Sequence, residues 1–434
     1  MKRGTIPASL LLIGLMGAMD TQAQPSGQDR PALSVGGMIR PVWLVQRVDD
    51  PFRDDMQVYH FFGRARLHAQ GSYRGLHFYT ELALAGREVE VLTSGGGTWG
   101  PNPVLLDFYF DLRPFELPFT VRIGQYRTPF GLEQLTEYRE LPFVERSLPY
   151  LFFGLGRDYG ATLYGKIGGL LDAALTVQSG TGRNLPERYI AMTLGTPLLA
   201  GRVGLNSGLP NGLNADEPYQ TERKWHGAVY LNALYVKDSF VGHSTALQVR
   251  LKDKPLLLNS NWNTFLARRP LDRGTLQMVG LDGVLQYRAA EWTIRAEAEY
   301  TQGTYKNTYG ELQAFGGRLQ AVLSGEKLDL GLRYAFVQPD ADFGRGLNTQ
   351  VPQPIGDKRI GELTPMLAYR LLGSNAKLII EVPVWFDMPV AIENNIGAYA
   401  LHQQPDQITY IRTAGNRIER QTLYGLQATV QLRF

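Results

Sequence analysis

Apolar and polar residues alternate along much of this chain, and residues 59–70 show the pattern most clearly. Their odd-numbered positions carry mainly apolar and aromatic residues, whereas the even-numbered positions include Arg64 and Arg66. A period of two indicates a β-strand with one apolar face and one polar face. Residues 76–84 repeat the pattern after a short turn at residues 71–75, so we expect a β-hairpin.

The same alternation recurs in fifteen further stretches of the chain. They are residues 34–46, 104–113, 119–125, 158–167, 171–179, 189–197, 225–237, 243–252, 276–287, 292–302, 315–324, 329–337, 361–371, 377–386 and 423–434. With the hairpin they make seventeen, whereas single-chain bacterial barrels have an even number of strands. We drop residues 189–197 or merge them with a neighbouring stretch, because they alternate weakly and end in Pro197. The pattern thus predicts an all-β fold, a transmembrane antiparallel β-barrel of sixteen strands, with eighteen as the alternative.

The segments between these stretches fall into two classes. Some are short polar turns, and others are long and rich in Gly, Pro, Asn and Asp. The long ones are residues 87–103, 180–188, 198–224, 253–274, 338–360 and 388–421. Short turns at one end and long loops at the other are typical of barrels in the bacterial outer membrane.

The end of the chain has the sharpest alternation. Leu426, Ala428, Val430, Leu432 and Phe434 are separated by polar residues. An apolar alternating strand that ends in an aromatic residue resembles the recognition signal of outer-membrane barrels. In such a barrel the apolar face contacts lipid and the polar face lines a wet lumen. We therefore expect the polar positions of each strand to point inward.

Residues 1–23 have the features of a secretory signal peptide. Two basic residues precede an apolar run at residues 6–19, which is too short to span a membrane as a helix. Residues 21–23 have the small-x-Ala pattern of a cleavage site. No later stretch approaches the ~20 apolar residues that a spanning helix needs. We expect residues 24–434 to form the mature barrel in the cell outer membrane.

The amino-acid composition argues against several classes of binding partner and functional site. The chain carries 44 basic and 41 acidic residues, a formal net charge of +3, which argues against a nucleic acid as the partner. It contains no cysteine, so disulfides, thiolate metal sites and cysteine nucleophiles are excluded. Arginine outnumbers lysine by 34 to 10, and the planar guanidinium fits carboxylate or phosphate groups.

A block at residues 123–148 has a more specific pattern. It reads IGQYRTPFGLEQLTEYRELPFVERSL, and it resembles the phosphate-selective porin O and P family. Weaker resemblances lie in matching order at residues 61–71, 315–326, 328–334 and 424–434. The resemblance implies a sixteen-stranded porin, a homotrimer, that passes small anions through an arginine-lined pore. It also implies a constriction made by a segment folded into the lumen.

Residues 127–157 are the candidate for this infolded constriction segment. They contain four arginines and three prolines, and the prolines prevent a long strand. Together with the arginines on predicted inner faces, they supply the candidate pore-lining and anion-binding residues. These are Arg40, Arg64, Arg66, Arg122, Arg127, Arg139, Arg146, Arg157, Arg250, Arg295, Arg318 and Arg333.

Acidic residues also occupy predicted inner positions. They are Glu81, Asp107, Asp111, Asp172, Glu297 and Glu299. A lining of mixed charge suits general hydrophilic solutes as well as anions. The expected hairpin turn places Arg64 opposite Glu81, where an ion pair would compete with anion binding. Both interpretations of Arg64 and Arg66, as anion-binding residues and as structural ion pairs, stay open.

These features predict an outer-membrane porin for passive diffusion, with a bias towards phosphate-like anions. Its partners would be outer-membrane lipid and small anionic or hydrophilic solutes. The alternative is a closed or narrow barrel whose long external loops bind a partner or a surface. We expect no enzyme activity, no cofactor and no metal site. The sequence has no Gly-x-Ser-x-Gly or His-Glu-x-x-His motif, and His68 and His77 lack a third ligand nearby.

Overall fold

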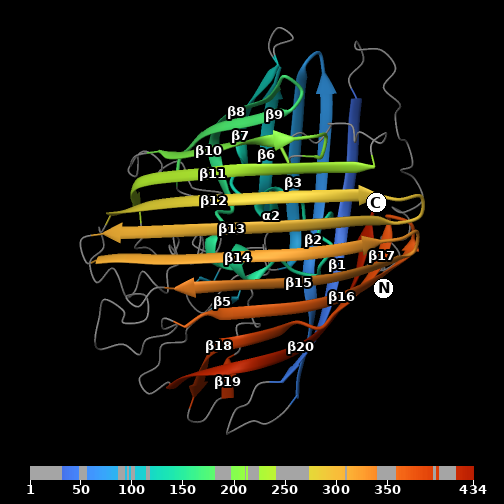
Figure 1. Cartoon of the computed structure of the whole chain (residues 1–434), viewed down its shortest axis with the longest axis vertical. Coiled ribbons are helices and arrows are strands. Elements are labelled where there is room, and N and C mark those ends of the chain that lie inside the picture. The colour runs from blue at the N-terminus through green and yellow to red at the C-terminus, as the bar shows by residue number, and fades with distance from the viewer. Residues whose placement is uncertain are drawn as a thin grey trace, which may run out of the picture.

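A ring of β-strands makes up most of the structure, a computed structural model (Figure 1). The structure describes residues 32–47, 56–86, 93–94, 97–98, 103–113, 118–180, 197–210, 212–213, 224–240, 273–307, 310–339, 358–393, 397–399 and 417–434. The candidate strand at residues 243–252, and all but the last residue of 189–197, lie outside these ranges.

The strands and helices have the following bounds. The strands are β1 (Ala32–Arg47), β2 (Met56–Tyr73), β3 (Leu76–Gly86), β4 (Thr93–Ser94), β5 (Gly97–Thr98), β6 (Val104–Leu112), β7 (Phe119–Arg127), β8 (Arg157–Ile167), β9 (Leu171–Gln178), β10 (Leu198–Asn206), β11 (Trp225–Phe240), β12 (Arg273–Arg288), β13 (Thr293–Asn307), β14 (Gly310–Ser324), β15 (Leu328–Pro339), β16 (Ile360–Leu372), β17 (Ala376–Glu381), β18 (Val384–Glu393), β19 (Gly397–Tyr399) and β20 (Arg417–Arg433). The helices are α2 (Leu132–Leu135) and α3 (Leu148–Phe153).

Each main strand pairs antiparallel with the next in chain order, and β20 pairs with β1 to close the ring. β17 and β18 share one place in it, because both pair with β16 on one side and with β20 on the other. The described residues thus form a closed antiparallel barrel of sixteen strands, which confirms the predicted fold class and strand number. The short β19 pairs with β18 as an extra strand, and β4 pairs with β5 in a separate two-stranded sheet.

The place shared by β17 and β18 is interrupted at Val382 and Pro383. Proline has no N–H to donate to a ladder, although the Pro383 carbonyl still accepts a hydrogen bond from the Gly425 N–H at 2.9 Å. The pattern predicted one unbroken strand at residues 377–386. It also predicted a loop at residues 388–421, and this is wrong at both ends because β18 and β20 extend into it.

Strand β10 lies in a stretch that the sequence assigned to a loop, residues 198–224. It pairs with β9 and β11 and supplies a strand of the sixteen, so this part of the prediction is wrong. The alternation is concealed for two reasons. Leu198 and Ala200 are buried on the inner face, where a polar residue is expected, and Gly201 has no side chain to mark the outer face.

The two faces of the barrel wall have opposite character. Large apolar side chains on the outer face are exposed, such as Leu175 (63 % exposed), Leu231 (62 %) and Leu319 (60 %). Arg40 and Arg64, in contrast, are among the largest fully buried side chains. A water-soluble protein shows the reverse distribution, whereas strands with lipid on their outer side need apolar residues outward and polar residues inward.

The helices of the described residues are short. None of them is long and apolar enough to cross a bilayer.

The hairpin of β2 and β3 has a tighter turn than the sequence predicted. Arg74 and Gly75 occupy the turn with φ values of 48° and 79°, so β2 extends further than expected. Gly75 adopts this left-handed conformation without strain because it has no Cβ. The register shifts accordingly, and Glu81 faces His68. The expected pairing of Arg64 with Glu81 is therefore wrong.

The seam of the barrel lies where β20 meets β1. The Gly37 N–H donates to the Phe434 carbonyl at 2.8 Å, and the Phe434 N–H donates to the Gly37 carbonyl at 3.2 Å. A Cβ on Gly37 would overlap with the Phe434 ring, so the close approach of the two strands requires glycine here. The alternating stretch predicted at residues 423–434 forms most of β20 and its end.

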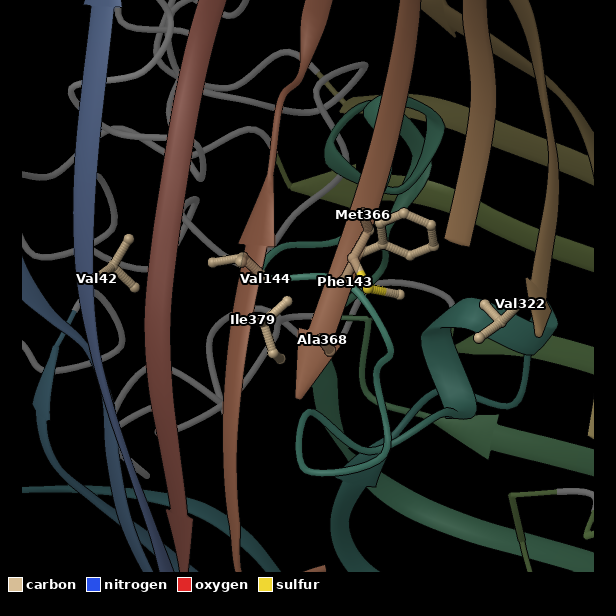
Figure 2. Packing of buried hydrophobic residues seen from close by; sticks show 7 residues of the cluster. All are labelled: Val42, Phe143, Val144, Val322, Met366, Ala368 and Ile379. Carbon is tan, nitrogen blue, oxygen red and sulfur yellow. The ribbon is translucent and has the colours of Figure 1, made fainter. Parts of the chain in front are cut away.

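Between β7 and β8 the chain leaves the wall. Residues 128–156, the lumenal segment, contain α2 and α3 and no strand. In Figure 1, α2 lies between the blue strands of the N-terminal part and the yellow and orange strands. Phe143 and Val144 of the segment pack in one buried cluster with side chains of β1, β14, β16 and β17 (Figure 2). The segment therefore lies on the inner side of the wall.

Candidate functional site

Carboxylates on one part of the wall accept hydrogen bonds from the backbone of the lumenal segment. The Val144 N–H donates to Glu381 Oε2 at 2.9 Å, and the Leu148 N–H donates to Glu362 Oε2 at 2.8 Å. Buried backbone donors need partners, and strand pairing supplies none to this segment. Wall carboxylates therefore take the place of a neighbouring strand.

Arginines on β1 and β2 bind the same segment through its oxygen atoms. Arg40 donates to the Val144 carbonyl at 2.8 Å and to the Tyr138 carbonyl at 3.1 Å. Arg64 forms an ion pair with Glu145 at 3.0 Å. Hydrogen bonds that involve an ionised group are stronger than neutral ones. The segment is thus fixed to two parts of the wall by charged groups.

Five arginines form one connected group where the segment meets β2, β7 and β8. This arginine cluster consists of Arg64, Arg66, Arg127, Arg146 and Arg157. Arg66 and Arg157 are joined through Glu81, whose Oε2 lies 3.2 Å from a guanidinium nitrogen of each. Arg157 also pairs with Asp107 at 2.8 Å.

Arg127 and Arg146 are joined through an uncharged oxygen. Both donate to the Thr136 carbonyl, at 3.1 Å and 2.6 Å respectively. Arg146 also donates to the Glu133 carbonyl, and Arg127 to the Leu135 carbonyl at 3.4 Å. Within the described residues, neither guanidinium has a carboxylate oxygen within 4.0 Å. No acidic side chain in the described part of the chain contacts these two guanidiniums directly.

The arginine cluster therefore contains two guanidiniums, those of Arg127 and Arg146, that no carboxylate of the described residues contacts. Arg64, Arg66 and Arg157 have carboxylate partners in Glu145, Glu81 and Asp107. The neighbouring Arg139 pairs with Glu137 and adds no net charge. An uncompensated positive field in a narrow polar passage favours anions over cations.

The opposite balance holds beside β13 and β14. Arg318 lies 2.9 Å from Glu297, 2.5 Å from Glu299 and 3.5 Å from Glu133. Arg295 pairs with Glu297 at 2.6 Å. In this carboxylate cluster, three carboxyl groups share two guanidiniums.

Glu133 connects the lumenal segment to the carboxylate cluster. The Glu133 carboxylate accepts two hydrogen bonds from Ser147, one from the Ser147 N–H at 2.9 Å and one from the Ser147 hydroxyl at 2.5 Å. Burial by itself raises the pKa of Glu133, but the nearby Arg318 and Arg333 outweigh burial and hold this pKa below its ordinary value. Glu133 is therefore ionised at neutral pH and holds the segment to the wall by charge.

A small cavity lies between the carboxylate cluster and the aromatic residues of the segment. Its volume is about 30 Å³, and Phe130, Tyr150, Phe153, Glu299 and Arg318 contribute to its lining. A space of this size holds one or two water molecules. It is too small for a hydrated solute.

The other arginines predicted for the pore also lie on the inner face where they are described. Arg122 pairs with Asp111 at 2.7 Å, and Arg333 pairs with Glu362 at 2.6 Å. Arg250 lies outside the described residues. These two pairs match the structural interpretation of inward arginines as partners of wall carboxylates.

Arg40 differs from these pairs. It is fully buried and donates to the Val144 and Tyr138 carbonyls and to the Gln431 side chain. Like Arg127 and Arg146, Arg40 has no carboxylate oxygen of the described residues within 4.0 Å of its guanidinium nitrogens. Uncharged oxygens hold all three.

Arg202 is an inward arginine that the sequence did not predict. It forms a bidentate pair with Asp282, with distances of 2.5 Å and 2.7 Å. Its Cζ also lies 3.8 Å from the centre of the Tyr230 ring. It was missed because β10 was assigned to a loop, and only recognition of that strand would have placed Arg202 on an inner face.

Part of the chain matches a known sequence family. Residues 38–204 match the family described as phosphate-selective porin O and P. The matched range contains the whole lumenal segment and all five members of the arginine cluster. It confirms, over those residues, the resemblance that the sequence indicated. No curated protein matches the chain in sequence.

Solved bacterial porins share the fold of this chain. OprB from Pseudomonas putida at high pH has a TM-score of 0.56 and 12 % identity, with 93 % of this chain and 94 % of that chain covered. An anion-selective porin from Comamonas acidovorans has a TM-score of 0.55 and 11 % identity, with 93 % and 100 % covered. OmpF from Salmonella typhi, in complex with daunomycin, has a TM-score of 0.50 and 11 % identity, with 93 % and 97 % covered.

Identities this low establish the fold alone, and the likeness to the family is limited to the match in sequence over residues 38–204. The sixteen-stranded barrel and the inward arginines agree with that match. The chain has the porin fold, and its residues 38–204 match the model of the phosphate-selective porin O and P family.

Proposed function

We propose that this protein is a passive porin of the cell outer membrane that admits small hydrophilic solutes and prefers phosphate-like anions. The observation that carries the proposal is the presence, on the inner side of a closed barrel, of Arg127 and Arg146, which no carboxylate of the described residues contacts. The family match, which covers every residue of that cluster, supports it.

The mechanism follows from the cost of removing an ion from bulk water. A passage lined with fixed positive charge lowers this cost for anions and raises it for cations. Guanidinium groups add geometric selection, because their paired N–H donors fit carboxylate and phosphate oxygens. Arg127 and Arg146 are the strongest candidates among the predicted anion-binding residues, since within the described residues their hydrogen bonds go to uncharged carbonyl oxygens.

We assign the size limit of the pore to residues 127–157, the predicted constriction segment. Its contacts with β1, β2, β16 and β17 support this assignment. A segment held to several parts of the wall narrows the lumen without closing the ring of strands. We further propose that residues 1–23 are removed as a signal peptide and that residues 24–434 form the mature barrel.

The partners follow from the two faces of the wall. Exposed leucines on the outer face fit contact with outer-membrane lipid, and the family resemblance suggests assembly as a homotrimer. The porin fold is that of a channel rather than an enzyme. We therefore propose that the protein has no catalytic activity.

Planar bilayer recordings with the purified protein test the channel and its selectivity separately. In symmetric KCl we expect discrete conductance steps, and in a KCl gradient we expect a reversal potential of the sign that chloride permeation gives. A protein that inserts but does not conduct would support the alternative, a closed barrel whose external loops bind a partner. A reversal potential of the opposite sign would refute the anion preference while leaving the channel intact.

A further inference from the structure

Tyr138 lies at the centre of the arginine cluster. The Cζ atoms of Arg64, Arg66 and Arg146 lie 4.2 Å, 4.7 Å and 4.5 Å from the centre of its ring. The Tyr138 carbonyl accepts a hydrogen bond from Arg40 at 3.1 Å. Four guanidiniums, from β1, β2 and the lumenal segment, therefore converge on one residue.

These guanidiniums repel one another, so something must hold them together. Carboxylates do this for Arg64 and Arg66, but each carboxylate removes one positive charge. An aromatic ring attracts cations through its quadrupole and carries no net charge. The ring of Tyr138 thus brings three guanidiniums together without reducing the positive field that they produce.

The ring is itself held in place. Tyr138 is 5 % exposed and packs with Met38 of β1 and Leu141 of the segment. A ring fixed in this way offers the guanidiniums a surface of constant position.

We propose that Tyr138 is a positioning residue for anion selectivity. It gathers Arg64, Arg66 and Arg146 beside the passage through cation–π contacts and adds no negative charge of its own. The inference rests on the proposed function, because it assigns to one side chain the arrangement on which the anion preference depends.

The test compares Tyr138→Phe with Tyr138→Leu in the full-length protein, by reversal potentials in a KCl gradient. Phenylalanine keeps the ring, so its ratio of anion to cation permeability should stay within about twofold of the unchanged protein. Leucine fills part of the space without a ring, so the ratio should fall by about threefold or more. An unchanged ratio in Tyr138→Leu, or equal losses in both variants, would overturn the proposal.

A second series keeps the shape of the ring and covers a failure of Tyr138→Leu to fold. Phenylalanine with one, two or three ring fluorines at position 138 weakens the quadrupole in steps and hardly changes the volume. The permeability ratio should fall in the same order at nearly constant conductance. A flat series would refute the cation–π role. Absence of anion preference in the unchanged protein would instead refute the proposed function.

Discussion

The arginine cluster and the carboxylate cluster contact the same lumenal segment but balance their charges in opposite ways. Arg318 has three carboxylates within 3.5 Å, whereas Arg127 and Arg146 share a single carbonyl oxygen. A charge surrounded by opposite charges fixes structure, and little of its field extends further. A charge held by uncharged oxygens keeps its field for an ion in the passage. The comparison separates anchoring arginines from arginines that act on solutes.

The largest effect on stability is expected from Arg318→Met. This change leaves three buried carboxylates without their shared partner, and removing one member of a buried ion pair costs about 3–5 kcal/mol. Arg127→Met is the matched control, which loses only hydrogen bonds to carbonyls and should cost about 1 kcal/mol. Urea unfolding of the refolded barrel measures both free energies. Equal losses would show that the two arginines do not differ in role.

The largest effect on selectivity is expected from Arg127→Glu. The change makes the charge of the arginine cluster more negative by two units, and we expect the ratio of anion to cation permeability to fall by about tenfold. Arg295→Glu makes the same change of charge in the carboxylate cluster and should have a clearly smaller effect. Reversal potentials in a KCl gradient measure both ratios. Comparable effects of the two variants would mean that total charge, rather than its position, controls selectivity.

A smaller and opposite effect is expected from Glu299→Gln. The amide oxygen can still accept the hydrogen bond that Glu299 receives from the Glu133 N–H at 3.1 Å, but the side chain can no longer carry a negative charge. The permeability ratio should therefore rise by about twofold. Glu326→Gln, in the exposed turn between β14 and β15, serves as the control and should leave the ratio unchanged. A fall in the ratio of Glu299→Gln would contradict the assignment of the carboxylate cluster as the negative region.

The smallest effect is expected from Glu133→Gln, on how far the free energy of unfolding falls in acid. The pKa of Glu133 is lower in the folded protein than in the unfolded chain, so the unfolded chain binds its proton more readily. Glu133 thus stabilises the fold above its ordinary pKa of about 4.3, and this stabilisation is lost as the pH falls through the lower, folded value. Glu133→Gln should therefore lose less unfolding free energy than the unchanged protein between pH 6 and pH 3. Equal losses would exclude Glu133 as a link sensitive to pH.

Much of the fold could be predicted because a barrel in lipid displays its pattern in the sequence. Lipid requires apolar residues on the outer face, and a wet lumen tolerates arginine and glutamate on the inner one. The prediction failed where this contrast is absent. In β10, Leu198 and Ala200 face inward and conceal the strand. The register of the first hairpin failed because a turn of Arg74 and Gly75 is shorter than composition suggested.

For the candidate site, the sequence could predict which residues face the lumen but not which residues they contact. Alternation placed Arg64 and Arg66 on an inner face, but their partners depend on the path of the lumenal segment. Glu145 is 81 residues from Arg64, and Glu362 is 214 residues from the Leu148 N–H that it binds. No spacing rule connects positions so far apart. Tyr138 carried no signal at all, because a tyrosine that contacts three guanidiniums is identical in sequence to any other.

The seam between β20 and β1 has a consequence for the order of assembly. Arg40 and Gln431, which meet across it, are 391 residues apart, so their contact is among the least local in the barrel. Contacts between distant residues form slowly, since loop-closure entropy is lost before they are made. Until the seam forms, β1 and β20 are two unpaired edges that can join another chain. The Phe434 ring over Gly37 therefore helps to hold the seam between β20 and β1 together. The folding protein is most prone to aggregation before this seam has formed.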